Sequence, residues 1–181
     1  AFSKYFDDAI EILFHLASAE TEQGIANNAT AIWNQAHRIV SSGTEAPFND
    51  RIARLRRRMD AVDPDQAELL ASATESALDD RGVRTLGPSI FGGRPVPAEW
   101  VPASRAEHVD ALRGTIALLT DLGKRFPAIS GRIRKALRGS VHRLVSVGFG
   151  NDLKSALGRM DDQEITEVRT VLTELSEDDR I

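Results

Sequence analysis

The chain has 181 residues, a net charge of −4 and no cysteine, and its length fits one domain that buries about 70% of its unfolded surface. The missing thiols exclude disulfides, thiolate zinc sites and cysteine nucleophiles, and they fit a cytoplasmic location. No apolar run of about 18 residues predicts a membrane span, no signal-peptide pattern is present, and the negative charge gives no global attraction to nucleic acid.

The first predicted helix covers residues 3–19 and is apolar over a wide arc. Its main face combines Phe2, Phe6, Ala9, Leu13, Leu16 and Ala17. Tyr5, Ile10 and Ile12 widen this face. Because a surface helix normally carries a narrower apolar stripe, we expect neighbours to cover this helix on two sides.

Three more helices are predicted over residues 21–41, 49–61 and 64–78. The apolar stripe of the second follows a 4-3-4-3 spacing at Ile25, Ala29, Ile32, Ala36 and Ile39. We expect Gly43 to end that helix in a left-handed cap. Asp63 caps the next start, and Pro64 takes the first helical position.

A crossover rich in proline and glycine follows at residues 80–103 and is longer than the usual ceiling of about 15 residues for a loop. It divides the single domain, 1–181, into possible halves 1–79 and 104–181. We expect Trp100 to help anchor the crossover to the helices. Arg94 and Trp100 are also candidate binding residues of this crossover.

Helical patterns return after the crossover. Ser104 and Glu107 form a capping box. The helices expected from there cover residues 104–123, 129–147, 152–160 and a last segment from about 161. With seven or eight helices and no strand, the predicted fold is all-α, either an irregular antiparallel bundle or stacked helical hairpins.

A basic helix face is the best candidate for a binding site. From Lys124 to Arg143 there are seven Lys or Arg residues and no acid. The residues opposite the apolar side are Arg132, Lys135, Arg138, His142 and Arg143. Guanidinium groups suit carboxylates or phosphates. The acid-rich residues 151–181 could neutralise this face instead, which leaves a solvated surface as the simpler interpretation.

A second cationic cluster lies on the third predicted helix. Its members are Arg51, Arg54, Arg56, Arg57 and Arg58. Like the first, it is interpreted as a charged helix surface.

No motif reaches the level of a catalytic signature, so no catalytic residue, metal or cofactor is predicted. Glu11 and His15 share a helix face but lack the second motif of a metal site. The glycines at 148 and 150 follow no predicted strand, which a dinucleotide site requires. We interpret them as a helix stop and restart.

These patterns favour a non-catalytic helical interaction, scaffold or regulatory module. The excess of Arg over Lys and the start within an apolar helix lead us to expect part of a larger, intracellular bacterial protein. Its partner would be another protein or the remainder of that chain, and the oligomeric state is left open. The alternative is a nucleic-acid-binding helical domain that uses the basic face at 132–143.

Overall fold

The computed structural model describes residues 3–21, 28–79, 90–91, 94–95 and 98–157. Within them the chain has an all-α fold with eight α-helices and two short 3-10 turns, Ser3–Tyr5 and Pro127–Ile129. The α-helices are α1 (Phe6–Ser18), α2 (Ala29–Ala36), α3 (Phe48–Arg58), α4 (Pro64–Ser76), α5 (Arg105–Arg125), α6 (Ser130–Gly139), α7 (Val141–Ser146) and α8 (Gly150–Leu157). The predicted all-α class is therefore confirmed.

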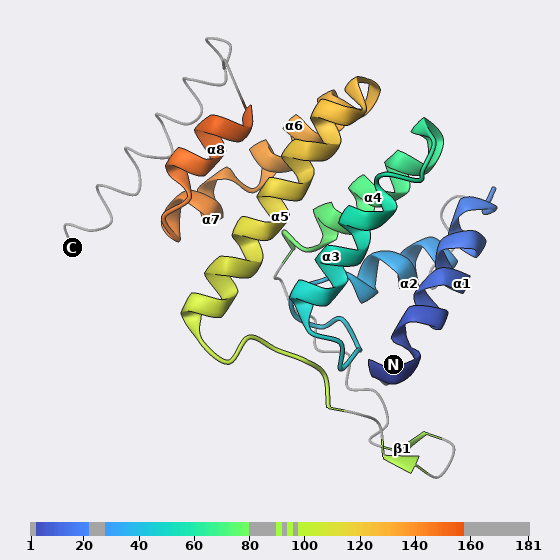
Figure 1. The fold of residues 1–181 in the computed structure, drawn as a ribbon. Coiled ribbons are helices and arrows are strands. Elements are labelled where there is room, and N and C mark those ends of the chain that lie inside the picture. Colours follow the sequence, from blue (N-terminus) through green and yellow to red (C-terminus); the bar gives the residue numbers. More distant parts are fainter. Residues whose placement is uncertain (1–2, 22–27, 80–89, 92–93, 96–97, 158–181) are drawn as a thin grey trace.

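The helices are stacked side by side across the molecule, with α1 and α2 at one edge and α7 and α8 at the other, as Figure 1 shows. The long helix α5 lies in the middle, with α3 and α4 packed on one side and α6 and α8 on the other. Helices α1 and α2 pack against each other and on α4, and side chains of α3 also contact both of them. The first helix therefore lies at one edge of the stack.

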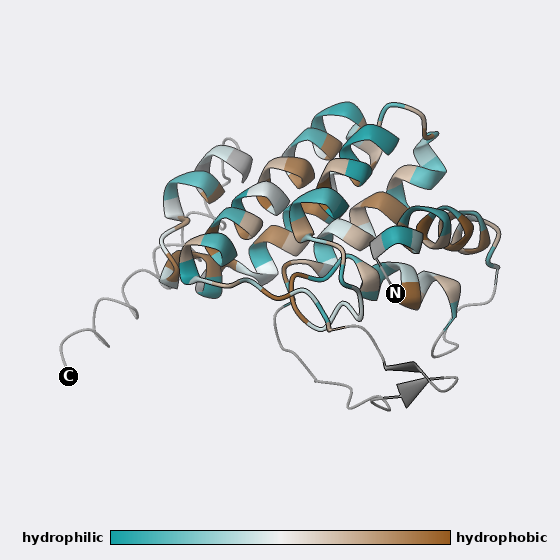
Figure 2. Cartoon of the chain, turned by 60° about the horizontal axis from the view of Figure 1, so that its bottom comes forward, coloured by the Kyte–Doolittle hydropathy of each residue, from teal (hydrophilic) through white to brown (hydrophobic). Residues whose placement is uncertain are grey.

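The core is mostly aliphatic, as the low aromatic content requires. Alanine and leucine fill the α4–α5 contact, where Leu70, Leu118 and Leu119 are fully buried. Aromatic residues concentrate under α1, where the rings of Phe14 and Trp33 lie 5.3 Å apart. Figure 2 shows hydrophobic and hydrophilic residues alternating along the helices, as expected for amphipathic helices that pack on one face.

Two predicted helix starts are confirmed in atomic detail. The Asp63 carboxylate accepts a hydrogen bond from the backbone N–H of Gln66, with Pro64 in the first turn of α4. The Ser104 hydroxyl accepts one from the N–H of Glu107 at 3.1 Å. Each side-chain oxygen satisfies a backbone donor that the first helical turn leaves unpaired.

The predicted second helix is too long, and its apolar stripe is wrong at Ile32, whereas Ile39 is buried as predicted. Helix α2 ends at Ala36, and Ile32 is 43% exposed. Trp33 takes the buried position instead, and its indole N–H donates to the carbonyl of Leu69 at 3.2 Å. The larger apolar side chain with a hydrogen-bond partner decides which face of this short helix is buried.

The predicted helix over 129–147 is two helices, α6 and α7, which are separated at Ser140. Gly139, the last residue of α6, favours a break because glycine is a poor helix former. Val141 and Leu144 are buried after the break. A two-residue antiparallel pair, Ile90–Phe91 with Arg94–Pro95, is the extended structure that the sequence did not predict. The predicted helix from 161 lies outside the described residues.

Candidate functional site

Three predicted binding residues line one groove. This groove of about 840 Å³ lies between α4 and the α6–α7 pair. Arg132, Lys135 and Arg143 contribute to one wall, and Glu75 and Asp79 contribute to the other. The structure thus brings part of the predicted basic face into a concave surface of mixed charge.

The acids of α4 already engage this face. Arg132 makes ion pairs with Glu68 at 2.7 Å and Glu75 at 3.2 Å. Asp79 pairs with Arg38 at 2.5 Å across the neighbouring surface. The sequence pointed to residues 151–181 as the neutralising acids, but Arg132 is paired from α4.

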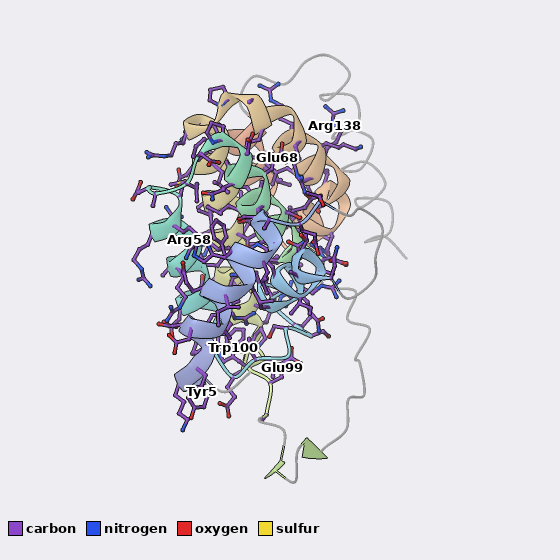
Figure 3. The ribbon with its side chains drawn as sticks, turned by 90° about the vertical axis from the view of Figure 1, so that its right-hand side faces the viewer. Tyr5, Arg58, Glu68, Glu99, Trp100 and Arg138 are labelled. Atoms are coloured by element: carbon purple, nitrogen blue, oxygen red, sulfur yellow. The ribbon has the colours of Figure 1, made fainter. Side chains whose placement is uncertain are left out.

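The other predicted residues of this face differ in exposure. Lys135 and Arg138 are exposed, and Arg143 is half-buried in α7. His142 lies in α7, but its side chain is outside what the structure describes. Figure 3 shows Arg138 at the opposite end of the molecule from Trp100. The predicted site residues therefore do not form one site.

The end of the crossover is anchored on the segment between α2 and α3. The backbone N–H of Trp100 donates to the carbonyl of Thr44 at 2.9 Å, and its ring stacks on Phe48. The Glu99 carboxylate accepts a hydrogen bond from the N–H of Ser42 at 2.5 Å. These contacts fit an anchoring role for Trp100, and a binding role for it stays a prediction, as it does for Arg94 in the short strand pair.

The sequence placed Arg51 in an exposed cationic cluster, but the structure places it in the core. Its side chain is fully buried and donates to the carbonyls of Ala36 at 3.0 Å and Arg38 at 2.5 Å. Burial lowers the pKa of Arg51 to about 10, so it stays charged at neutral pH. Its spacing from Phe48 and Leu55 on the buried face of α3 was the sequence signal that could have placed it inside.

Three other arginines of that cluster pair with acids from distant helices. Arg56 binds Asp121 of α5 at 2.7 Å. Arg54 and Arg58 form ion pairs with Asp7 and Glu11 of α1. This part of the cationic surface therefore joins helices to one another.

The outer face of α1 is apolar and exposed. It consists of Ala9, Ile12 and Leu16 of α1, with Tyr5 of the preceding 3-10 turn and the C-cap residue Ala19, and of these only Ala9 is half-buried. Tyr5 is 54%, Ile12 60% and Leu16 55% exposed, whereas Phe6 and Phe14 on the inner face are each 2% exposed. Figure 3 looks onto α1, with Tyr5 at its lower end. Leu16 was expected in the core. The prediction was also that neighbours cover this helix on two sides, and the described residues cover only one of them.

The comparisons with known proteins leave the function to be argued from this geometry. No family model, curated protein or solved structure matches the chain. In the described part of the chain, no helix combines the length and apolar character needed to cross a membrane.

Titratable groups do not gather into a metal centre in the described residues. Glu11 and His15 form an exposed pair at 3.0 Å, one helical turn apart. His37 is different, because it is fully buried and its pKa is lowered to about 4, chiefly by desolvation. No sequence pattern indicated this burial, since His37 was expected inside a longer helix.

Proposed function

We propose that the chain is a non-catalytic helical interaction module in which the outer face of α1 docks onto the same face of a second copy. The observation that carries this proposal is the seam of exposed apolar residues on α1, in which Ile12 is 60% exposed. The cysteine-free sequence fits a reducing environment, so a scaffold or regulatory role in the cytoplasm is part of the proposal.

The spacing of the outer face suits a helix as partner. Its residues follow one another at intervals of 4, 3, 4 and 3. Two apolar residues in each seven form the seam that helices present to each other in a coiled coil. The inner face of α1 already uses a separate apolar set, which includes Ile10 and Phe14, to bind the core. An apolar seam that is left in water is a feature of interaction surfaces.

A second copy complements this seam in size and charge. In an antiparallel pair, Ile12 faces the small Ala9 of the second copy, and Leu16 faces the ring of its Tyr5. Asp8 and His15 follow the same edge of the seam, so each aspartate would lie opposite a histidine of the other copy. A two-fold symmetric interface needs such a self-complementary surface.

The dimer should be weak. In a standard interface each partner buries about 800 Å² of accessible surface, and one helix face provides less than this. We expect a dissociation constant between about 10 and 500 µM, which corresponds to about 5 to 7 kcal/mol of association free energy.

Sedimentation velocity over about 10 µM to 1 mM tests the proposal. The wild-type chain should shift toward a dimer as concentration rises. Ile12→Glu should weaken the dimer at least about tenfold, because a carboxylate would be placed in an apolar seam. Val101→Glu is the matched control, since Val101 is 55% exposed, close to the 60% of Ile12, but lies outside α1.

Two results would contradict the proposal. One is a wild-type chain that stays monomeric at about 1 mM. The other is a dimer that Ile12→Glu and Leu16→Glu both leave intact while their circular dichroism matches the wild type. A dimer of the second kind would use another surface, and the groove between α4 and α6 would be the next surface to probe.

A further inference from the structure

The groove between α4 and the α6–α7 pair has walls of unlike charge. Lys135 and Arg143 line it on the α6–α7 side, and Glu75 lines it on the α4 side. Most of the other lining residues are small, namely Ser72, Ser76, Ala136, Gly139 and Ser140. Because the distance between packed helices depends on the side chains at their contact, these small residues allow a further helix to approach closely. None of the residues of the outer face of α1 lines the groove, so the groove and the proposed dimer surface can be tested separately.

Lys135 provides a cation that the rest of the groove does not use. Its side chain is exposed, and it makes no ion pair with any other described residue. Arg132, on the same wall, is already paired with Glu68 and Glu75. A carboxylate that enters the groove can therefore pair with Lys135 without breaking an existing ion pair.

Residues 158–181, which we call the acidic segment, provide such carboxylates. The segment carries eight acids and three arginines. It follows Leu157, the last residue of α8, and α8 contacts both α6 and α7. A helix of eight residues is only about 12 Å long, so the segment starts close to the α6–α7 wall. Its 24 residues span about 36 Å even as a helix, which is long enough to reach the groove.

The charges of the acidic segment match the two walls if residues 164–172 are helical, as the sequence predicts. At about 100° per residue, Ile165, Val168 and Leu172 form one apolar stripe. Glu164 and Glu167 follow one edge of this stripe, and Arg169 follows the other edge. These three are the only charged residues from 164 to 172. A helix with one acidic and one basic edge complements a groove with one basic and one acidic wall.

We propose that residues 164–172 dock as a helix into the groove between α4 and the α6–α7 pair of the same chain. The apolar stripe packs on the small residues, Glu164 or Glu167 pairs with Lys135, and Arg169 faces Glu75. The lining residues of α4 and its end, from 72 to 79, extend over about two helical turns, which is the length of the docked part. Docking covers Lys135, so the acidic segment competes with any other anionic partner of this wall.

Carbodiimide crosslinking of the full chain tests the proposal, because this reagent joins a lysine to a carboxylate that is in contact with it. At about 5 µM protein, below the dissociation constant expected for the dimer, Lys135 should be joined to Glu164 or Glu167. These links should be at least about fivefold more frequent than links from Lys124 to the segment, because docking raises the effective concentration of the acids at Lys135. Lys124 is the matched control, since it is also exposed but does not line the groove.

A mixture of isotope-labelled and unlabelled chains shows which copy supplies the segment. Links that join Lys135 to a segment of the same isotope composition support docking within one chain. Links that join labelled and unlabelled chains as often as chance predicts would mean that the segment comes from a second copy, and they would overturn the proposal.

Nuclear magnetic resonance of a double variant locates the contact independently. Glu164→Gln with Glu167→Gln removes the acids that would face Lys135 and weakens docking. The backbone amide resonances of Gly139 and Ser140, which line the groove, should therefore shift relative to the wild type.

A second double variant is the matched control. Asp162→Asn with Glu177→Gln removes the same charge from the edge of the predicted helix that carries Arg169, so the resonances of Gly139 and Ser140 should stay in place. The proposal is overturned if the two double variants shift these resonances alike or if neither shifts them. It is also overturned if Lys135 and Lys124 are joined to the acidic segment equally often.

Discussion

At the scale of single residues, His37 makes stability depend on pH. Burial lowers its pKa from 6.5 in the unfolded chain to about 4 in the folded one. Between these values the unfolded state binds more protons. The contribution of neutral His37 to the free energy of unfolding is therefore fully present above pH 6.5 and falls as the pH approaches 4. The shift corresponds to a loss of roughly 2 to 3 kcal/mol by about pH 4.5.

Urea unfolding at about pH 7.5 and 4.5 measures this loss. His37→Phe should lose roughly 2 to 3 kcal/mol less than the wild type between the two values, because it has no proton to take up. His15→Phe is the control, because it makes the same substitution at a histidine that is 70% exposed. Equal losses in the wild type and in His37→Phe would show that carboxylates alone set the pH dependence.

Arg51 is the other buried charge at this scale. Its guanidinium closes the end of α2 by binding the carbonyls of Ala36 and Arg38, and Glu99 stabilises its charged form. Arg51→Met should lower the free energy of unfolding by about 2 to 4 kcal/mol, because it leaves these acceptors without a donor. Arg56→Met, which breaks a surface ion pair, should cost less than about 1 kcal/mol in the same urea experiment.

At the scale of helices, local signals predicted the starts of α4 and α5 well, but both bounds of α2 were wrong. The caps of α4 and α5 depend on side chains within three residues of the helix, so the sequence contains the whole interaction. The end of α2 depends on Arg51, which comes 15 residues after Ala36. The spacing of apolar residues does not reveal a contact with a residue so far along the chain, so the predicted helix continued past Ala36.

Two glycines at helix ends provide a prediction at the same scale. Gly139 ends α6, and a Cβ added there meets no atom within 4 Å. Gly148 has the same free space but a φ of +96°, which side chains rarely adopt. Gly139→Ala should stabilise the chain by about 0.5 to 1 kcal/mol, and Gly148→Ala should destabilise it by about 1 kcal/mol or more.

Thermal unfolding of both variants compares the two sites directly. The added methyl group is the same in each, so the backbone conformation is the main difference between them. If both variants shift the midpoint of thermal unfolding in the same direction, the prediction is wrong, because the φ angles indicate opposite effects at the two glycines.

At the scale of the whole molecule, most of the candidate site could not be predicted because its partners are far apart in the chain. Arg132 pairs with Glu68 over 64 residues, and Arg56 pairs with Asp121 over 65. Composition reveals cationic stretches but not the acids that meet them. The apolar width of α1 was visible in the sequence, whereas the exposure of Leu16 depends on which neighbours the fold supplies.

The same pairing bears on the alternative function, nucleic-acid binding by the basic face. Glu68 and Glu75 offset the charge of Arg132, and the chain as a whole is negative. We therefore expect duplex DNA to bind with a dissociation constant weaker than about 100 µM near 150 mM salt. The double variant Glu68→Gln, Glu75→Gln should strengthen binding several-fold at low salt, because it releases Arg132 to contact phosphates.

Fluorescence anisotropy with labelled duplex DNA over a salt series distinguishes the two functions. Micromolar binding by the wild type, with a steep salt dependence that the double variant Arg132→Glu, Arg138→Glu abolishes, would favour the nucleic-acid function over the dimer. Weak binding that this variant leaves unchanged would mean that the face is a solvated surface. The outer face of α1 would then be the surface that requires a partner. Its exposed side chains are apolar, and removing them from water lowers the free energy of the system.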